Sequence, residues 1–168
     1  ENNPDYTKYI CGEGGILQKW IALGAQGWRL DVADELPDEF LDNINKAVKG
    51  MGGDKIVYGE VWEDASNKES YGVRRRYLNG GQLDSVMNYP FKEAILNYVK
   101  YADAKAFTDS VMTILDHYPK PAIDMLMNFL STHDTERALT RLAGDDIGWN
   151  GKDWQAERYL NGQQYMYG

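Results

Sequence analysis

Three acidic residues occupy positions in the sequence from which they could carry out chemistry. Asp31 ends a segment in which Trp28, Leu30 and Val32 alternate with polar residues, which is the period of a strand. Glu60 lies in a β-branched and aromatic run over residues 56–62, and Asp134 follows the apolar run 125–130. Side chains at the carboxyl ends of parallel strands form the sites of α/β proteins. We therefore expect these acids to lie at strand ends.

The spacing of Asp31 and Glu60 suggests a particular reaction. They are 60 − 31 = 29 residues apart, the length of one strand–helix–strand unit. Neighbouring parallel strands lie about 4.8 Å apart, so carboxylates at equivalent ends would be roughly 5–6 Å apart. A retaining glycoside hydrolase needs a nucleophile and an acid/base at about that separation. Each motif taken alone more often has a structural role. Only the presence of all three motifs together weighs against a structural role.

The neighbours of the two acids predict different protonation states. Arg29 lies two residues before Asp31, on the same face of the strand, and its charge favours an ionised Asp31. Tyr58 and Trp62 flank Glu60, and their rings together with the nearby anion favour a protonated Glu60. Cleavage of a glycosidic bond requires one ionised and one protonated acid.

The elements that must position these acids alternate along the chain. Strands are expected at 27–32, 56–62, 83–88 and 125–130. Helices are expected at 16–23, 37–48, 91–101, 104–117, 135–142 and 154–167, with a polar loop over 63–81. Four consecutive strand–helix units predict an α/β fold with a parallel sheet or part of a barrel.

Composition excludes several classes of function. The 168 residues carry a net charge of −8, which argues against a nucleic-acid partner or an anionic membrane surface. No apolar run has the roughly 18 residues of a membrane helix. Cys11, the only cysteine, has no nearby basic group to activate it, and two histidines are too few for an all-histidine zinc site. We expect Arg74–Arg76 to be part of a solvated or salt-bridged loop, and Asp145–Asp146 to form an exposed turn.

Three segments together resemble the signature regions of a known family. Gly27–Glu35 reads GWRLDVADE, Tyr58–Trp62 reads YGEVW, and Ser131–Arg137 reads STHDTER. In this order they resemble the second, third and fourth signature regions of the α-amylase family of glycoside hydrolases. The details are most similar to its neopullulanase, cyclomaltodextrinase and α-glycosidase branch.

The resemblance implies a role for each acid. Asp31 matches the nucleophile that forms a glycosyl-enzyme ester, and Glu60 matches the acid that protonates the leaving oxygen and later activates water. Asp134 matches the third carboxylate, which stabilises the distorted transition state. The implied substrates are α-glucan oligosaccharides of the starch type, and no cofactor is implied.

The resemblance also implies substrate-binding residues. Arg29 matches the arginine that orients the nucleophile, and His133 matches a histidine that hydrogen-bonds the sugar. Trp62 and Glu35 match positions that line the leaving-group side.

The implied fold is a partial TIM (β/α)8 barrel, with residues 1–168 forming one partial catalytic domain that covers roughly strands four to seven. Such a half-barrel exposes two strand edges, so we expect it to self-associate or to pair with the missing half, and to be nearly inactive alone. Calcium is expected, if anywhere, in the parent protein, and no metal ligands are assigned in this chain. We expect a cytoplasmic protein, since no leader is visible.

Two other interpretations stay open at this point. A non-catalytic amylase-like module that binds carbohydrate or a partner would keep the fold, but it would not need all three acids. A flavodoxin-like nucleotide binder is disfavoured because no Gly-rich phosphate turn lies at a strand–helix junction. The preference for α-1,4 or α-1,6 bonds is also open.

Overall fold

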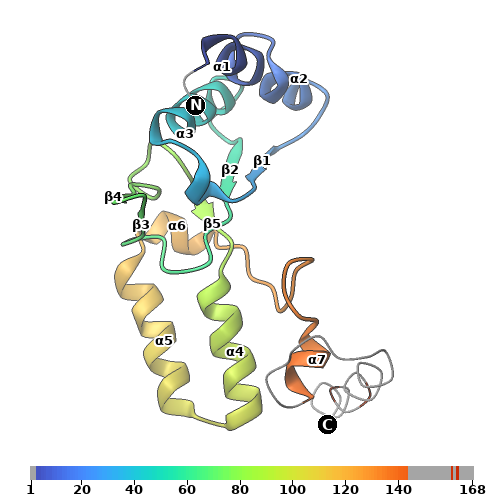
Figure 1. Ribbon diagram of the computed structural model, residues 1–168, viewed down its shortest axis with the longest axis vertical. Helices are drawn as coiled ribbons and strands as arrows, with labels where there is room; N and C mark the ends of the chain where they lie inside the picture. The colour runs from blue at the N-terminus through green and yellow to red at the C-terminus, as the bar shows by residue number, and fades with distance from the viewer. Residues whose placement is uncertain (1–2, 144–159, 161, 163–168) are drawn as a thin grey trace. The chain divides into compact units, whose positions relative to one another are not determined.

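A computed structural model describes residues 3–143, 160 and 162 (Figure 1). Its elements follow in chain order: α1 (Pro4–Cys11), α2 (Ile16–Ala22), β1 (Gly27–Leu30), the 3-10 helix η1 (Ala33–Glu35), α3 (Asp38–Lys49), β2 (Ile56–Gly59), β3 (Glu69–Ser70), β4 (Val73–Arg74), β5 (Ser85–Val86), α4 (Tyr89–Tyr101), α5 (Ala104–His117), α6 (Lys120–Asp124) and α7 (Ala138–Leu142). The chain forms two compact units, Glu1–Met87 with Leu115–Met127, and Asn88–Ile114 with Asn128–Gly168.

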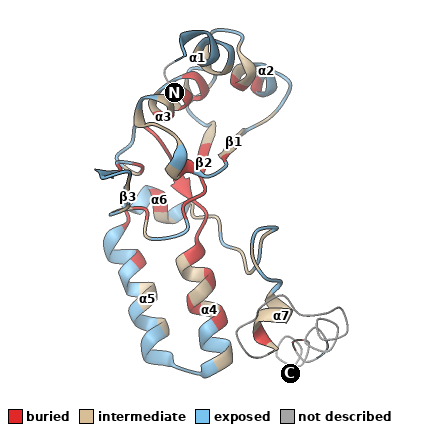
Figure 2. Ribbon diagram, in the orientation of Figure 1, coloured by how far each residue is buried: buried red, intermediate tan, exposed pale blue. Residues whose placement is uncertain are grey.

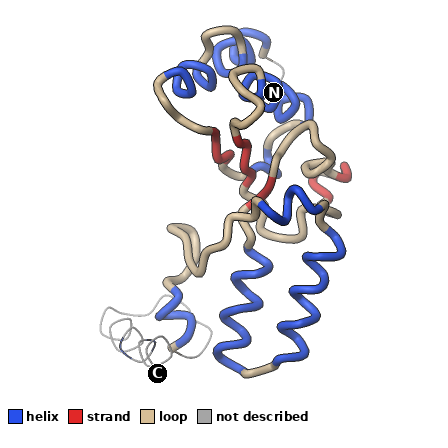
Figure 3. Tube along the Cα trace, turned by 180° about the vertical axis from the view of Figure 1, so that it is seen from behind, coloured by secondary structure: helices blue, strands red, loops and turns tan. Residues whose placement is uncertain are grey.

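The first unit contains a parallel sheet with the strand order β1-β2-β5. Figure 3 shows the strands of the described chain, and all of them belong to this unit. β1 pairs with β2 in a register that sets Gly27 opposite Ile56 and Leu30 opposite Gly59. The three predicted strands at 27–32, 56–62 and 83–88 are therefore confirmed, although each is shorter than expected. The fourth, at 125–130, is reduced to a single parallel bridge between Met87 and Met127.

Helices α1, α2 and α3 pack against one another in this unit. α3 carries the expected apolar stripe, and Figure 2 shows its buried positions. The buried residues of this stripe are Leu41, Ile44, Ala47 and Val48. The stripe is buried because residues three and four apart share one face of a helix. α1 was not predicted, because its eight residues bury no side chain and so show no apolar stripe.

The expected loop over 63–81 contains a short antiparallel hairpin, β3–β4. Its turn residues Tyr71 and Gly72 both have positive φ, 53° and 73°. Two positive φ values are what a two-residue hairpin turn of type I′ requires. The sequence did not indicate the hairpin, since strands of two residues are too short to show a period. The expected salt bridges are confirmed: Arg75 lies near Asp38, and Arg76 pairs with Asp42.

The second unit is held together largely by aromatic contacts. Tyr89 in α4 meets Phe129 edge-on at 4.8 Å between ring centroids, and Tyr98 lies 5.1 Å from Phe107. α7 packs on α4, and it begins at Ala138 rather than at the expected residue 135. The expected helix at 154–167 and the expected turn at Asp145–Asp146 lie outside the described residues.

Within the described part of the chain, no helix has the length and apolar character needed to cross a membrane.

Cys11 ends α1, and burial raises the pKa of its thiol to about 11. At pH 8 the thiolate fraction is then about a hundredfold lower than at an ordinary cysteine, since each pKa unit is a factor of ten. We expect iodoacetamide to alkylate Cys11 about a hundredfold more slowly than it alkylates free cysteine at pH 8, with the rate still rising between pH 9 and 11. Mass spectrometry over a time course measures this, and rapid labelling at pH 8 would contradict the raised pKa of the half-buried thiol.

Candidate active site

Asp31 and Glu60 follow two paired strands at the same level. β1 ends at Leu30 and β2 ends at Gly59, and these two residues are partners in the ladder. Hydrogen bonds continue the pairing past the strand ends: Glu60 N–H donates to the Leu30 carbonyl at 3.0 Å, and Ala33 N–H donates to the Glu60 carbonyl at 3.1 Å. The parallel register therefore brings both acids to one edge of the sheet, as their spacing predicts.

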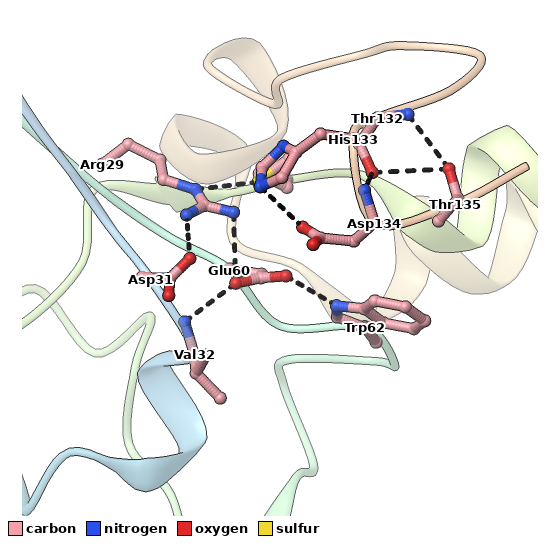
Figure 4. A network of polar contacts seen from close by, with 10 residues as sticks. Arg29, Asp31, Val32, Glu60, Trp62, Thr132, His133, Asp134 and Thr135 are labelled. Carbon is pink, nitrogen blue, oxygen red and sulfur yellow. Dashed lines mark hydrogen bonds and ion pairs between the residues drawn. The ribbon is translucent and has the colours of Figure 1, made fainter. Parts of the chain in front are cut away.

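One guanidinium joins the two acids. Arg29 Nη1 binds Asp31 Oδ1, and Arg29 Nη2 lies 3.1 Å from Glu60 Oε2 (Figure 4). A fork of donors that bridges two carboxylates holds their contacting oxygens within roughly 8 Å of each other. Arg29 is itself fixed from the third strand, because its Nε donates to Met87 Sδ at 3.3 Å. No pattern in the sequence indicated this role for Met87.

Glu60 is buried and held by donors on both oxygens. Its side chain is 5% exposed. Besides Arg29, the backbone N–H of Val32 donates to Oε2 at 2.8 Å, and the indole N–H of Trp62 donates to Oε1 at 2.8 Å (Figure 4). Both oxygens of Glu60 therefore have partners within the first unit.

This arrangement corrects the expected environment of Glu60. Trp62 meets Glu60 through a hydrogen-bond donor and not only through an apolar ring face. Tyr58 points its hydroxyl at the carbonyl of Met125, 2.6 Å away. Arg29, expected to serve Asp31 alone, pairs with Glu60 as well, because the neighbouring strand places the second carboxylate on the same face. That Glu60 holds the proton and Asp31 is ionised stays a prediction.

Asp31 differs from Glu60 in its access to solvent. Its side chain is 72% exposed, and Arg29 binds one of its oxygens. The guanidinium of Arg29 lies beside this exposed carboxylate. Glu60 is buried and held by its donors, whereas Asp31 is exposed. Asp31 is therefore available to a molecule that arrives from solvent.

Val32, the residue after Asp31, has an unusual backbone. Its φ is 42°, in the left-handed region that a β-branched residue rarely adopts. This conformation costs about 1–2 kcal/mol. The N–H of this strained residue donates to Glu60, so the strain lies at the site itself. No side-chain pattern could have revealed a backbone donor.

The two expected leaving-side residues belong to the same unit. Trp62 is 49% exposed, and Glu35 is exposed at the end of η1. Glu35 accepts a hydrogen bond from the hydroxyl of Tyr71. Tyr71 carried no signal in the sequence, because it lies 36 residues from Glu35 in a loop.

His133 and Asp134 belong to the second unit. His133 Nε2 lies 3.1 Å from Asp134 Oδ2, and Asp134 N–H donates to Thr132 Oγ1 at 3.2 Å (Figure 4). The hydroxyl of Thr135 accepts the Thr132 N–H at 3.0 Å, which closes a tight turn before α7. Neither Asp134 nor Thr135 caps α7, since α7 begins after Arg137. That Asp134 joins Asp31 and Glu60 around one sugar stays a prediction.

The predicted site residues do not line a groove that lies elsewhere in the first unit. That groove has a volume of about 680 Å³ and lies among α1, α2 and α3. In the described residues, no three acidic, histidine or cysteine side chains are grouped as metal ligands. Calcium in a longer protein stays a prediction, and the proposed mechanism uses no metal ion.

Comparison with known proteins decides the family. Residues 2–167 match the family described as Alpha-amylase, "Alpha amylase, catalytic domain". The chain belongs to the α-amylase family. As a part of that catalytic domain, it supplies consecutive parallel segments of a TIM barrel, and the recognition of the family from three motifs is confirmed.

Several α-amylase family members are similar to this chain. A cyclomaltodextrinase of a Bacillus species is 36% identical over 146 residues, which cover 85% of this chain and 24% of that protein. Neopullulanase 2 of Thermoactinomyces vulgaris is 34% identical, over 86% of this chain and 23% of its own length. The cyclic α-maltosyl-(1→6)-maltose hydrolase of Arthrobacter globiformis has a similar structure, with a TM-score of 0.74, 30% identity, and coverage of 85% of this chain and 30% of that chain. The chain therefore spans about a quarter of the length of the curated relatives it matches.

Proposed function

We propose that this chain supplies the nucleophile and the acid/base of a retaining α-glycosidase that acts on α-glucan oligosaccharides. The bridge from Arg29 to both Asp31 and Glu60 is the observation that carries the proposal, because it holds two carboxylates at one edge of the sheet. The names of the relatives support the substrate class: one is a cyclomaltodextrinase and another a neopullulanase.

In the proposed mechanism, Asp31 attacks the anomeric carbon while the glycosidic C–O bond breaks. Glu60 gives a proton to the departing oxygen, and a glycosyl ester forms on Asp31. Glu60, now a carboxylate, then takes a proton from water, whose oxygen attacks the anomeric carbon and releases Asp31. Before the reaction Glu60 must hold a proton, so its contact with Arg29 has to weaken when substrate binds.

The three donors to Glu60 have a function in the second step of this mechanism. They stabilise its carboxylate, which is the form that must accept a proton from water. Arg29 favours an ionised Asp31 for the first step, and it pairs with the Asp31 carboxylate again when the ester breaks. We further propose that Asp134 and His133 bind hydroxyl groups of the same sugar.

The covalent intermediate offers a direct test. With a 5-fluoro-α-glucosyl fluoride, the complete enzyme should gain the mass of one fluoroglucosyl group, and peptide mapping should place it on Asp31. The fluorine slows both steps, and the good leaving group restores only the first, so the ester accumulates. Asp42→Asn, which changes an aspartate outside the site, is a matched control and should label normally. A complete enzyme that turns over substrate but never carries the label would contradict the retaining mechanism.

The alternative function is a non-catalytic, carbohydrate-binding member of the family. It predicts oligosaccharide binding without turnover in the complete protein, and no label on Asp31. The exposure of Asp31 beside a buried acid favours catalysis over this alternative.

We propose further that the 168-residue chain has little activity on its own, and that it pairs with the rest of a barrel or with itself. A cytoplasmic location is proposed from the intracellular maltogenic amylase of Bacillus subtilis, which is 33% identical to this chain.

A further inference from the structure

The tip of the β3–β4 hairpin carries a large aromatic residue in an unfavourable position. Tyr71 is 77% exposed and has a φ of 53°. Asn, Asp or Gly usually occupies such a turn position, because a side chain with a bulky Cβ substituent costs about 1–2 kcal/mol there. Packing does not explain a tyrosine at this place, since most of its surface faces solvent. The residue type therefore points to a use of its ring outside the fold.

The hairpin is fastened to the segment that follows Asp31. The hydroxyl of Ser70 donates to the carbonyl of Asp34 at 2.9 Å, and the hydroxyl of Tyr71 donates to the carboxylate of Glu35. Both acceptors belong to η1, which begins two residues after Asp31. The hairpin is thus attached to the same loop that presents the proposed nucleophile.

Asp34 anchors the hairpin from both of its sides. Lys68, just before β3, places its ammonium 3.1 Å from Asp34 Oδ2. Tyr77, after β4, is fully buried and donates its hydroxyl to Asp34 Oδ1 at 2.7 Å. Because the chain is held before and after the turn, the position of Tyr71 relative to η1 is fixed.

A ring held in this way is suited to stacking. Its hydroxyl is bound to Glu35 while most of the residue is exposed, so the ring has little freedom to rotate away. The apolar C–H face of a pyranose packs well on an aromatic ring, and a preorganised ring loses little entropy when a ligand binds. The carboxylate of Glu35 beside it can accept hydrogen bonds from sugar hydroxyl groups.

We propose that Tyr71 is a stacking platform for a sugar unit on the leaving-group side of the cleft, with Glu35 as its polar partner. The proposal rests on the proposed glycosidase function and adds a specificity-determining residue to it. Tyr71 then favours oligosaccharides that are long enough to reach the hairpin. The ring of Trp62 is half-exposed, and its indole N–H donates to Glu60.

The test compares Tyr71→Ala with Tyr71→Phe in the complete enzyme. The assay measures kcat/KM for maltoheptaose and for an aryl α-glucoside, which has no sugar on the leaving side. We expect Tyr71→Ala to lower the ratio of the two constants about tenfold, mainly through a higher KM for maltoheptaose; tenfold corresponds to about 1.4 kcal/mol. Tyr71→Phe keeps the ring and should retain most of the ratio. Tyr9→Ala, which changes another exposed tyrosine, in α1, is the matched control and should leave the ratio unchanged.

Other outcomes have definite meanings. If Tyr71→Phe and Tyr71→Ala lower the ratio equally, the hydroxyl only fastens the loop, and the proposal that Tyr71 stacks on a sugar is wrong. An unchanged ratio in Tyr71→Ala also overturns it. If the complete enzyme turns over no α-glucan, the proposed function fails separately, and calorimetric titration with maltoheptaose still tests the platform: Tyr71→Ala must weaken binding about tenfold and Tyr71→Phe must not.

Discussion

Glu60→Gln is expected to lower kcat of the complete enzyme on maltooligosaccharides by about 10²–10⁴-fold, the usual contribution of a general acid/base. Glutamine cannot donate the proton that the departing oxygen needs, and it cannot accept one from water afterwards. Its amide also has a single acceptor, whereas both oxygens of Glu60 accept hydrogen bonds in the structure. Steady-state kinetics with maltoheptaose measure the loss.

A substrate with a good leaving group separates the chemical effect from misfolding. An α-glucosyl fluoride needs little protonation to depart, so the first step should survive in Glu60→Gln and the glycosyl ester should accumulate. A burst of fluoride release followed by slow turnover is the expected signature. Glu13→Gln, a change at an exposed glutamate, is the control and should behave like the unmodified enzyme. Equal losses on maltoheptaose and on the fluoride, without a burst, would mean that Glu60 is structural.

Gly27→Ala is expected to destabilise the protein by about 2–4 kcal/mol, among the larger effects of a single substitution. A Cβ at residue 27 would lie 2.1 Å from the carbonyl oxygen of Ile56, a backbone atom of the paired strand. No side-chain rotation can relieve that overlap, so β1 and β2 would have to move apart. The midpoint of urea unfolding, followed by circular dichroism, measures the effect.

The control for this change is another glycine of the same unit. A Cβ at Gly53 would meet no atom within 4 Å, so Gly53→Ala should shift the midpoint only slightly. If Gly27→Ala were as stable as Gly53→Ala, the close approach of β1 to β2 would be wrong. Activity of the complete enzyme should fall together with stability in Gly27→Ala, because Asp31 and Glu60 directly follow β1 and β2.

Much of the first unit could be predicted from local pattern. The alternation around Trp28 and Leu30 indicated β1, and the apolar spacing from Leu41 to Val48 indicated α3. Such elements bury one face, and the face leaves a period in the sequence. Where burial is slight the period is lost, which is why α1, the β3–β4 hairpin and the shortened fourth strand were missed or misjudged.

The family, the order of the strands along the chain and the candidate acids all follow from residue type and local spacing, because both are written directly in the chain. Only the tertiary structure decided that Arg29 serves both Asp31 and Glu60, and that the Val32 N–H points at Glu60. It alone placed Tyr71 beside Glu35. Val32 and Glu60 are 28 residues apart, and Glu35 and Tyr71 are 36 apart. Contacts at such separations depend on strand register and backbone dihedral angles, which no local pattern of residue types specifies.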